Sequence, residues 1–270
     1  MPAASPPRFL AIECSTDTLS VALGSGRPGD AVAEHTGPGG PQSSTSLLPA
    51  VRRLLTQAGC TLADLSAIAF ARGPGSFTGL RTACAVAQGL AFGVDVPVLP
   101  VDTLLAVAEE ARWSQVQAGA IAPDAPLTVL ALLDARMDEV YSAAYRWEPV
   151  PGPSHGRWQE AAPLQVGAPE KLQMPDGPMV LLAGNAFAAY GERLPQVVSE
   201  GWRCEALPSA GATIAGRYST GPGGKGFNQA VAAARAGAST TFITALGADD
   251  TAAGARALAQ AEGIDLRDEV

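Results

Sequence analysis

The chain has 270 residues, of which 47% are hydrophobic and 16% are charged, a composition that excludes wholesale disorder and can supply a core. Its formal net charge of −8 argues against direct binding to nucleic-acid phosphates, which depends on clustered Lys and Arg. The four cysteines are widely spaced, so we expect small hydrophobic thiols in a reducing compartment. The first residues lack an export signal, and no apolar run is long enough to span a membrane. We therefore predict a soluble cytoplasmic protein.

The first hundred or so residues predict an α/β domain. Three apolar runs that should pair as antiparallel strands precede an amphipathic helix, a strand, a second helix and another strand. The amphipathic helix has apolar residues from Leu47 to Leu55 on one face, and Gly59 ends it. In chain order we expect strands at 8–16, 18–26 and 31–35, a helix around 47–55, a strand at 67–71, a helix at 79–92 and a strand at 96–102.

A second series of elements follows a similar order. We expect strands at 127–136, 139–147 and 163–167, a short helix near 168–173, a strand at 179–185 and a helix through 190–194. Two rounds of βββαβα predict two similar lobes, residues 1–103 and 104–206, which is the plan of the actin/hexokinase-like (ribonuclease H-like) α/β fold. Gly and Ala become more frequent after this point, and we expect a separate α/β fragment at 207–270.

A glycine-rich turn, "GPGSFTGLR", lies between the strand at 67–71 and the helix at 79–92. The backbone N–H groups of such a turn and the start of the helix can bind an anion. Alternatively, the glycines let the helix pack closely against the strand. The spacing of the glycines does not match a dinucleotide-binding motif. The turn contains Gly73, Pro74, Gly75, Ser76, Phe77, Thr78, Gly79 and Arg81.

The helix after this turn is apolar on nearly all sides. Between Leu80 and Phe92 only Arg81, Thr82 and Gln88 are polar, and many of the other residues are small. One sheet can cover only one side of such a helix. Either the second lobe or a partner chain must therefore cover the other side.

Few residues are candidates for catalysis or metal binding. The two histidines, His35 and His155, are far apart and lie in no ligand motif. In the actin/hexokinase-like fold the turn after the first strand holds a nucleotide phosphate. Glu13, Ser15 and Thr16 could take that role here, and a polar hairpin tip is the alternative. A charged cluster at a later strand turn is either a solvated hairpin tip or a polar contact with a partner: Asp134, Arg136, Asp138 and Glu139.

Five segments in order resemble the bacterial TsaB (YeaZ) family: "FLAIECSTDTLSVAL", "FARGPGSFTGLRTACAVAQGLAFG", "VLPVDTLLAVAEEA", "DARMDEVYSAAY" and "LLAGNAF". The resemblance covers about residues 8–208. It implies a non-catalytic subunit that binds and activates the catalytic subunit TsaD in threonylcarbamoyl transfer to adenosine 37 of tRNAs that read codons starting with A. The ATPase TsaE joins this complex. The tRNA would be contacted only indirectly, and ATP or ADP could bind at the interface of the complex.

The resemblance also implies which helices contact TsaD. The first-lobe helices around 47–55 and 80–92 would pack against it as a helical bundle, and the same helices could pair two copies of this chain. On this basis neither a catalytic residue nor a metal ligand is expected in the chain. The interface residues expected are Leu47, Leu48, Val51, Leu55, Ala83, Val86 and Leu90.

The end of the chain departs from this family. A TsaB chain should continue after "ALPSA" with a further helix and a short tail, and the sequence shows no sign of either. Instead, residues from 207 onward resemble the first part of ribokinase, a PfkB-family sugar kinase, whose sugar-holding loop corresponds to Gly223, Gly224, Lys225 and Asn228. The sugar-binding Asp, the catalytic base and the ATP site of such a kinase are missing, so we expect an incomplete or poorly ordered fragment. A PfkB-type carbohydrate kinase fragment or fusion is the alternative function, and the absent ligands argue against a metallopeptidase.

Overall fold

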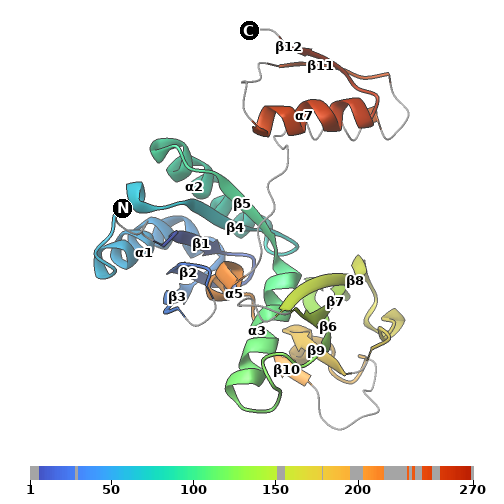
Figure 1. Ribbon diagram of the computed structural model, residues 1–270. Helices are drawn as coiled ribbons and strands as arrows, with labels where there is room; N and C mark the ends of the chain where they lie inside the picture. Colours follow the sequence, from blue (N-terminus) through green and yellow to red (C-terminus); the bar gives the residue numbers. More distant parts are fainter. Residues whose placement is uncertain are drawn as a thin grey trace. The chain divides into compact units, whose positions relative to one another are not determined.

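The structure, a computed structural model, describes residues 6–27, 30–150, 156–177, 179–194, 203–215, 230, 233–234, 239–244 and 250–268. The chain divides into two compact units, residues 1–217 and 218–270, and the first unit contains two α/β lobes (Figure 1). Among the described helices, none is both long enough and apolar enough to cross a membrane.

The first lobe is built on a five-stranded sheet in the order β3-β2-β1-β4-β5. The neighbours β3, β2 and β1 are antiparallel, whereas β1, β4 and β5 are parallel. The expected antiparallel pairing of the first three strands is confirmed, and the two later strands join the sheet in parallel. The strands span Phe9–Glu13 (β1), Thr18–Gly24 (β2), Ala33–Pro38 (β3), Ala67–Gly73 (β4) and Val98–Asp102 (β5).

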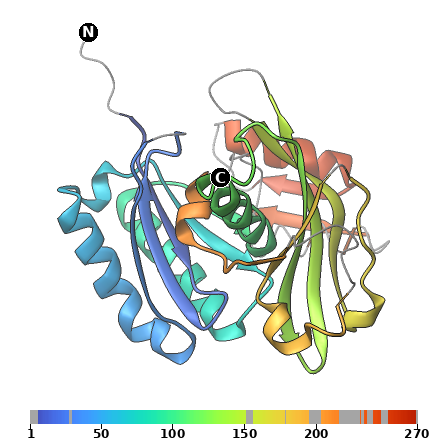
Figure 2. The same cartoon turned by 90° about the horizontal axis from the view of Figure 1, so that it is seen from below.

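Helices α1 (Ser43–Gln57) and α2 (Phe77–Val94) cover one face of this sheet, which we call the outer face (Figure 2). Side chains alternate between the two faces of a strand. The large side chains of β1, β2 and β4, among them Leu10, Ile12 and Ile68, form the core of the lobe together with α1 and α2. The opposite, inner face therefore carries small buried side chains: Ala11, Ser20, Ala22, Ala69 and Ala71.

The second lobe repeats the sheet order of the first. Its strands are arranged β8-β7-β6-β9-β10, with β6, β7 and β8 antiparallel and β6, β9 and β10 parallel. This repeat confirms the predicted two-lobed α/β fold. The strands span Leu127–Arg136 (β6), Glu139–Pro149 (β7), Gly156–Gly167 (β8), Val180–Gly184 (β9) and Arg203–Glu205 (β10), and Ala186–Tyr190 form the helix α4.

Two further helices connect the lobes. Helix α3 (Thr103–Gln117) packs against β6, β7 and β9 of the second lobe and against β4 and β5 of the first. Helix α5 (Ala210–Ala215) packs against β1, β2 and β4 and against α3 (Figure 2). We did not expect α3 as a helix, because Glu109 and Arg112 interrupt its apolar face; both are buried as an ion pair, with 2.7 Å between Arg112 Nη2 and Glu109 Oε1.

Three expectations are corrected here. A helix does follow "ALPSA", since α5 begins at Ala210, and it lies in the first unit although we assigned residues 207–270 to a separate fragment. The short helix expected near 168–173 is a single 3-10 turn, Pro169–Lys171, because Pro169 permits a turn to start and Leu172 returns to the extended conformation. Strand β8 begins at Gly156, earlier than the expected residue 163. The sequence did not indicate this start, because polar residues on the exposed side of the strand obscure the alternation of apolar and polar side chains.

The second unit is described in part. Strands β11 (Thr241–Thr244) and β12 (Asp265–Asp268) are parallel neighbours, and helix α7 (Asp250–Ala261) connects them. A small core of Ala230, Ala255, Ala259 and Ile264 lies between the helical residues and the strands. Parallel strands joined by a helix are the arrangement that the helix–strand order of this stretch predicts.

Candidate partner-binding surface

The glycine turn of the first lobe closes tightly over the end of β1. The Ser76 backbone N–H donates a hydrogen bond to the carbonyl oxygen of Ser15 at 2.6 Å. A Cβ atom at Gly75 would lie 2.4 Å from that oxygen, and one at Gly79 would lie 1.8 Å from the carbonyl oxygen of Cys14. These contacts leave no room for side chains at the two glycines. Of the two expected interpretations, the geometry therefore supports close packing of the turn against the strand rather than an anion site.

The start of α2 is fixed by the same turn. The Ser76 side chain caps the helix, because its Oγ accepts a hydrogen bond from the Gly79 N–H at 3.3 Å. Phe77 and Thr78 are exposed, and the guanidinium of Arg81 lies 3.7 Å from the centre of the Phe77 ring. The turn thus holds one aromatic side chain at the exposed beginning of the helix.

The residues considered for a phosphate turn are placed differently from that expectation. Glu13 and Ser15 are buried, and the Ser15 N–H donates to Glu13 Oε1 at 2.6 Å. Burial raises the pKa of Glu13 to about 7, against an opposing effect of hydrogen bonds from Ser15. Only Thr16 is partly exposed, so a nucleotide phosphate approaching from solvent would not reach the other two residues. Among the described residues, no group of His, Cys, Asp and Glu side chains could hold a metal ion.

Four of the seven side chains expected at a partner interface are in the core of the lobe. Leu47, Val51, Leu55 and Ala83 are buried between the helices and the sheet, so the prediction that they form an outer surface is wrong. The physical reason is that the apolar stripe of an amphipathic helix faces its own sheet first. Val86 and Leu90 are partly buried against the same core, and only Leu48, 45% exposed, points outward.

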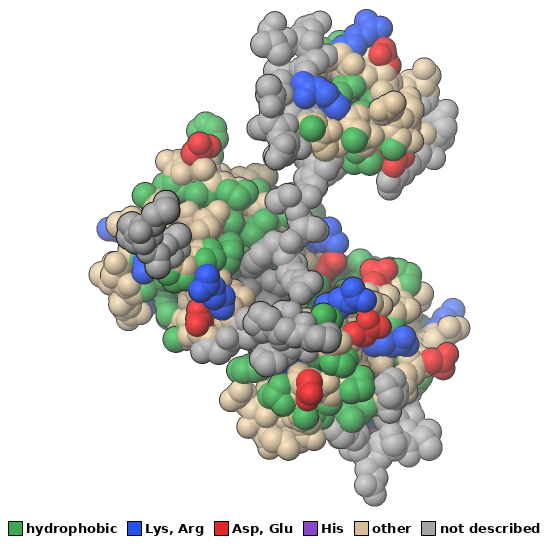
Figure 3. Space-filling model, viewed as in Figure 1, with side chains coloured by type: hydrophobic (Ala, Val, Ile, Leu, Met, Phe, Trp, Pro, Cys, Tyr) green, Lys and Arg blue, Asp and Glu red, His purple; other side chains and the backbone are tan. Residues whose placement is uncertain are grey.

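A different set of residues forms the outward side of α2. Phe77 is 68% exposed and Phe92 is 92% exposed, and Ala85 and Gly89 lie exposed between them. These residues recur at intervals of three, four or eight, so they share one side of the helix. Hydrophobic side chains gather over α2 in Figure 3. We call this side, from Phe77 to Phe92, the α2 face.

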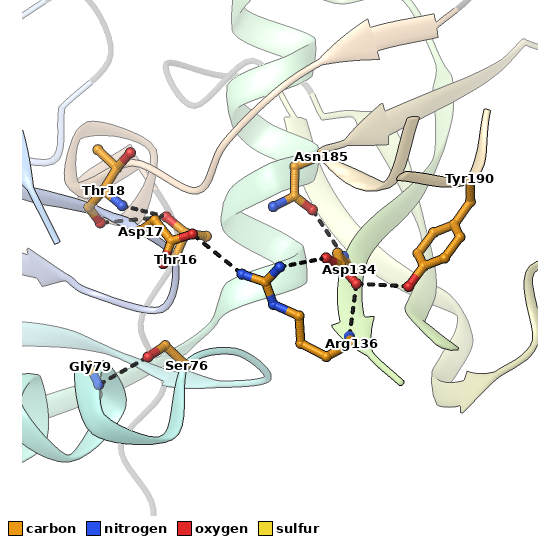
Figure 4. A network of polar contacts seen from close by, with 9 residues as sticks. All are labelled: Thr16, Asp17, Thr18, Ser76, Gly79, Asp134, Arg136, Asn185 and Tyr190. Atoms are coloured by element: carbon orange, nitrogen blue, oxygen red, sulfur yellow. Dashed lines mark hydrogen bonds and ion pairs between the residues drawn. The ribbon is translucent and has the colours of Figure 1, made fainter. Parts of the chain in front are cut away.

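The charged cluster at the β6–β7 hairpin contacts the first lobe (Figure 4). Arg136 Nη2 lies 3.3 Å from Asp17 Oδ2, which follows β1, and Arg136 Nη1 lies 3.2 Å from Asp134 Oδ2. The Tyr190 hydroxyl donates to Asp134 Oδ1 at 2.9 Å. Asp138 pairs with Arg193 instead. The cluster therefore makes most of its contacts within the second lobe, and of these contacts only the Arg136–Asp17 pair reaches the first lobe; neither of the two expected interpretations included such contacts within the chain.

The sugar-loop residues Gly223, Gly224, Lys225 and Asn228 lie outside the described residues. Their role therefore stays a prediction from the resemblance. The described part of the second unit, including β11 and α7, follows this loop in the sequence.

Two family models match the chain in different places. The model of TsaD, tRNA N6-adenosine threonylcarbamoyltransferase, matches residues 34–194. The model of the pfkB family carbohydrate kinases matches residues 203–269. The two matches do not overlap, which supports the two resemblances expected from the motifs.

Individual relatives point to one family for the first unit. The tRNA threonylcarbamoyladenosine biosynthesis protein TsaB of Escherichia coli (strain K12) is 38% identical over 184 residues, which are 68% of this chain and 73% of the relative. TsaB of Haemophilus influenzae is 35% identical over 190 residues, covering 68% of this chain and 74% of the relative. The structure of YeaZ from Pseudomonas aeruginosa superimposes with a TM-score of 0.63 at 35% identity, over 77% of this chain and 89% of that one. The chain therefore belongs to the TsaB (YeaZ) family of tRNA threonylcarbamoyladenosine biosynthesis proteins.

Proposed function

We propose that the chain acts in tRNA threonylcarbamoyladenosine biosynthesis as a non-catalytic subunit that binds and activates TsaD through the α2 face. The observation that carries this proposal is that Phe77 and Phe92 are exposed on one side of α2. Ala85 and Gly89 are exposed on the same side of the helix. The two positions are fifteen residues apart in the sequence, so their Cα atoms lie about 22 Å apart along the helix axis. Large exposed apolar side chains with small residues between them suit a second helix laid along α2.

The charge of the chain supports an indirect role toward tRNA. With a net charge of −8, the chain has an excess of carboxylates that would repel a phosphate backbone. The match of the TsaD family model over residues 34–194 adds that the chain is similar in fold to its proposed partner. A pair of related two-lobed proteins can meet through equivalent helices, as in a pseudo-symmetric dimer.

The test is binding of the full chain to TsaD with charges placed on the α2 face. We expect Phe92→Glu and Ala85→Glu each to weaken the complex by about 2 kcal/mol or more, roughly thirtyfold in Kd, because a carboxylate would be buried without a partner. Isothermal titration calorimetry would measure Kd, and threonylcarbamoylation of tRNA by the complex would fall in parallel at limiting concentrations. Leu164→Glu, at a 51% exposed position on β8, is the matched control and should bind normally.

If both α2 variants bind TsaD as tightly as the unmodified chain, the α2 face is not the binding surface. If Leu164→Glu weakens TsaD binding equally, the substitutions act through a general effect on the fold. Val51→Glu, which the sequence alone suggests, cannot serve as a test. Val51 lies in the core of the first lobe, so a carboxylate there would disrupt the lobe whether or not the helix contacts a partner.

A kinase activity of the second unit is the other candidate, favoured by the pfkB family match at residues 203–269. The ribokinase resemblance would require a sugar-binding Asp and a catalytic base, and we identified neither in the sequence. We therefore expect the purified chain to leave ribose unphosphorylated in the presence of ATP. Phosphate transfer to ribose, followed by mass spectrometry of the product, would contradict this expectation.

A further inference from the structure

The β6–β7 hairpin ends in a turn whose backbone conformation is unusual for its residues. Arg136 pairs with Glu139, so the connection consists of Met137 and Asp138. The φ angles of Arg136, Met137 and Asp138 are 64°, 52° and 68°. Two central residues with positive φ match a type I′ turn, which favours Asn and Gly because a side chain such as that of Met is crowded in the left-handed region. The turn therefore holds Met137 in a strained backbone conformation.

Contacts from the rest of the second lobe hold this turn in place. On one side, the Arg136 N–H donates a hydrogen bond to Asp134 Oδ1 at 2.8 Å. On the other side, Arg193, which follows α4, donates through Nη2 to Asp138 Oδ2 at 2.9 Å. These contacts fix the backbone before and after Met137. They do so through the neighbouring residues, so they would hold the turn equally with a residue that suits the left-handed region better.

The Met137 side chain contributes little to the packing of the chain. It is 93% exposed, the largest exposed fraction of any large hydrophobic side chain among the described residues. A single exposed hydrophobic side chain is ordinary on a protein surface. Here, however, the exposure coincides with backbone strain, and strained residues cluster at sites where the residue has a function. Methionine adapts its shape to irregular apolar recesses, which suits a contact with another protein.

The hairpin tip adjoins the start of the α2 face. From the tip, Arg136 reaches Asp17 in the turn after β1, with 3.3 Å between Nη2 and Oδ2. The same turn carries the Ser15 carbonyl oxygen that accepts from the Ser76 N–H, and Phe77 follows as the first residue of the α2 face. Figure 4 shows Arg136 extended toward Asp17, with Ser76 on the adjoining turn. A partner that lies along α2 and extends past Phe77 would therefore meet the hairpin.

We propose that the tip of the β6–β7 hairpin, with Met137 as its contact residue, is a second binding site for TsaD. This inference rests on the proposed function, because the tip takes the same partner as the α2 face. Met137 enters an apolar recess on TsaD, and the bound partner removes from water a side chain that the free chain exposes. The strain at the turn lowers the stability of the free chain, and the contact in the complex offsets this cost.

The test uses Met137→Asn in the full chain. Asn removes the apolar side chain but occupies the left-handed region readily, so we expect the midpoint of urea denaturation to rise. The same substitution should weaken TsaD binding about tenfold in Kd, measured by isothermal titration calorimetry. Weaker binding by a more stable chain cannot result from unfolding.

Two further variants are the controls. Leu164→Asn removes a hydrophobic side chain that is 51% exposed on β8, away from the tip, and should leave Kd unchanged. Met137→Leu keeps both the strain and an apolar side chain at the tip, so it should keep most of the affinity for TsaD.

Several results would overturn the proposal. If Met137→Asn binds TsaD normally while Phe92→Glu does not, the hairpin site is wrong and the α2 face stands. If Met137→Asn instead reduces self-association of the free chain, the tip is a contact between two copies. A lowered denaturation midpoint would contradict the strain, and equal weakening by Met137→Leu would contradict an apolar contact. If the unmodified chain does not bind TsaD, the proposed function fails and the hairpin site fails with it.

Discussion

Glu13 shows how one buried side chain can make stability depend on pH. Its carboxyl group is inaccessible at the end of β1, and burial raises its pKa from 4.5 to about 7. Between these two pH values the folded chain keeps the proton that the unfolded chain has released. The folded state therefore binds more protons, and the free energy of unfolding decreases as pH rises through this window.

We expect Glu13→Gln to remove this dependence. A pKa shift from 4.5 to about 7 corresponds to about 3 kcal/mol. In the unmodified chain the free energy of unfolding should fall between pH 5 and pH 8, and in Glu13→Gln this fall should be smaller by about that amount. Urea denaturation at the two pH values would measure it. Glu139→Gln, at an exposed position on β7, is the control and should keep the difference found in the unmodified chain. A Glu13→Gln variant with the same pH dependence as this control would contradict the assignment.

Helix α2 contains glycines with opposite roles. Gly79 is packed against the backbone of β1, where an added Cβ would lie 1.8 Å from the Cys14 carbonyl oxygen. Gly89 has no atom within 4 Å of such a Cβ. The first glycine is required by the close approach of helix and strand, while within this chain the second is not required by packing and adds conformational freedom to the unfolded state.

This contrast predicts opposite effects of the same substitution. Gly79→Ala should destabilise the chain by about 3 kcal/mol or more, because the backbone must shift. Gly89→Ala should stabilise it by up to about 1 kcal/mol, as expected for an exposed position inside a helix. Thermal denaturation of the two variants would measure both effects. Similar changes for both would mean that the turn does not hold α2 as closely as described.

At the scale of the whole molecule, helices rather than ion pairs connect the two lobes. The pair Arg136–Asp17 joins two hairpin turns, but its side chains are 73% and 84% exposed. Exposed pairs gain little, so a double-mutant cycle with Arg136→Ala and Asp17→Ala should give a coupling energy below about 1 kcal/mol. A coupling of several kcal/mol in urea denaturation would show that the hairpin contact has a larger share in holding the lobes together.

The two units should also separate under limited proteolysis. The first unit includes α5, which is packed on the sheet of the first lobe, so the resistant fragment should contain residues up to Ala215. The sequence alone predicts trimming that begins at about residue 210. Intact mass spectrometry of the early fragments would distinguish these end points, and a stable product that ends before Ala210 would contradict the assignment of α5 to the first unit.

Much of the fold could be predicted from local pattern. The runs around β1, β2, β4, β6 and β7 are apolar and bounded by turn residues, and "GPGSFTG" marks the start of a helix. Such signals depend on neighbouring residues alone, so they can be recognised in the sequence. Helix α3 was missed because the Glu109–Arg112 pair looks exposed in the sequence. In the folded chain Trp158 Nε1–H donates to Glu109 at 2.8 Å and Arg112 lies over the Trp147 ring, and these tertiary contacts compensate the burial of the pair.

The sequence by itself determined most of the order of elements along the chain, the two similar lobes and the family, since these follow from residue spacing and ordered motifs. Only the tertiary structure decided which side of each helix remains exposed. Leu47 and Phe92 both read as apolar helix residues, but the first faces the sheet and the second faces solvent. The same holds for α5, a short small-residue helix with a weak local signal. Its place is set by contacts with Ser20 and Glu110, which lie about a hundred or more residues away in the sequence.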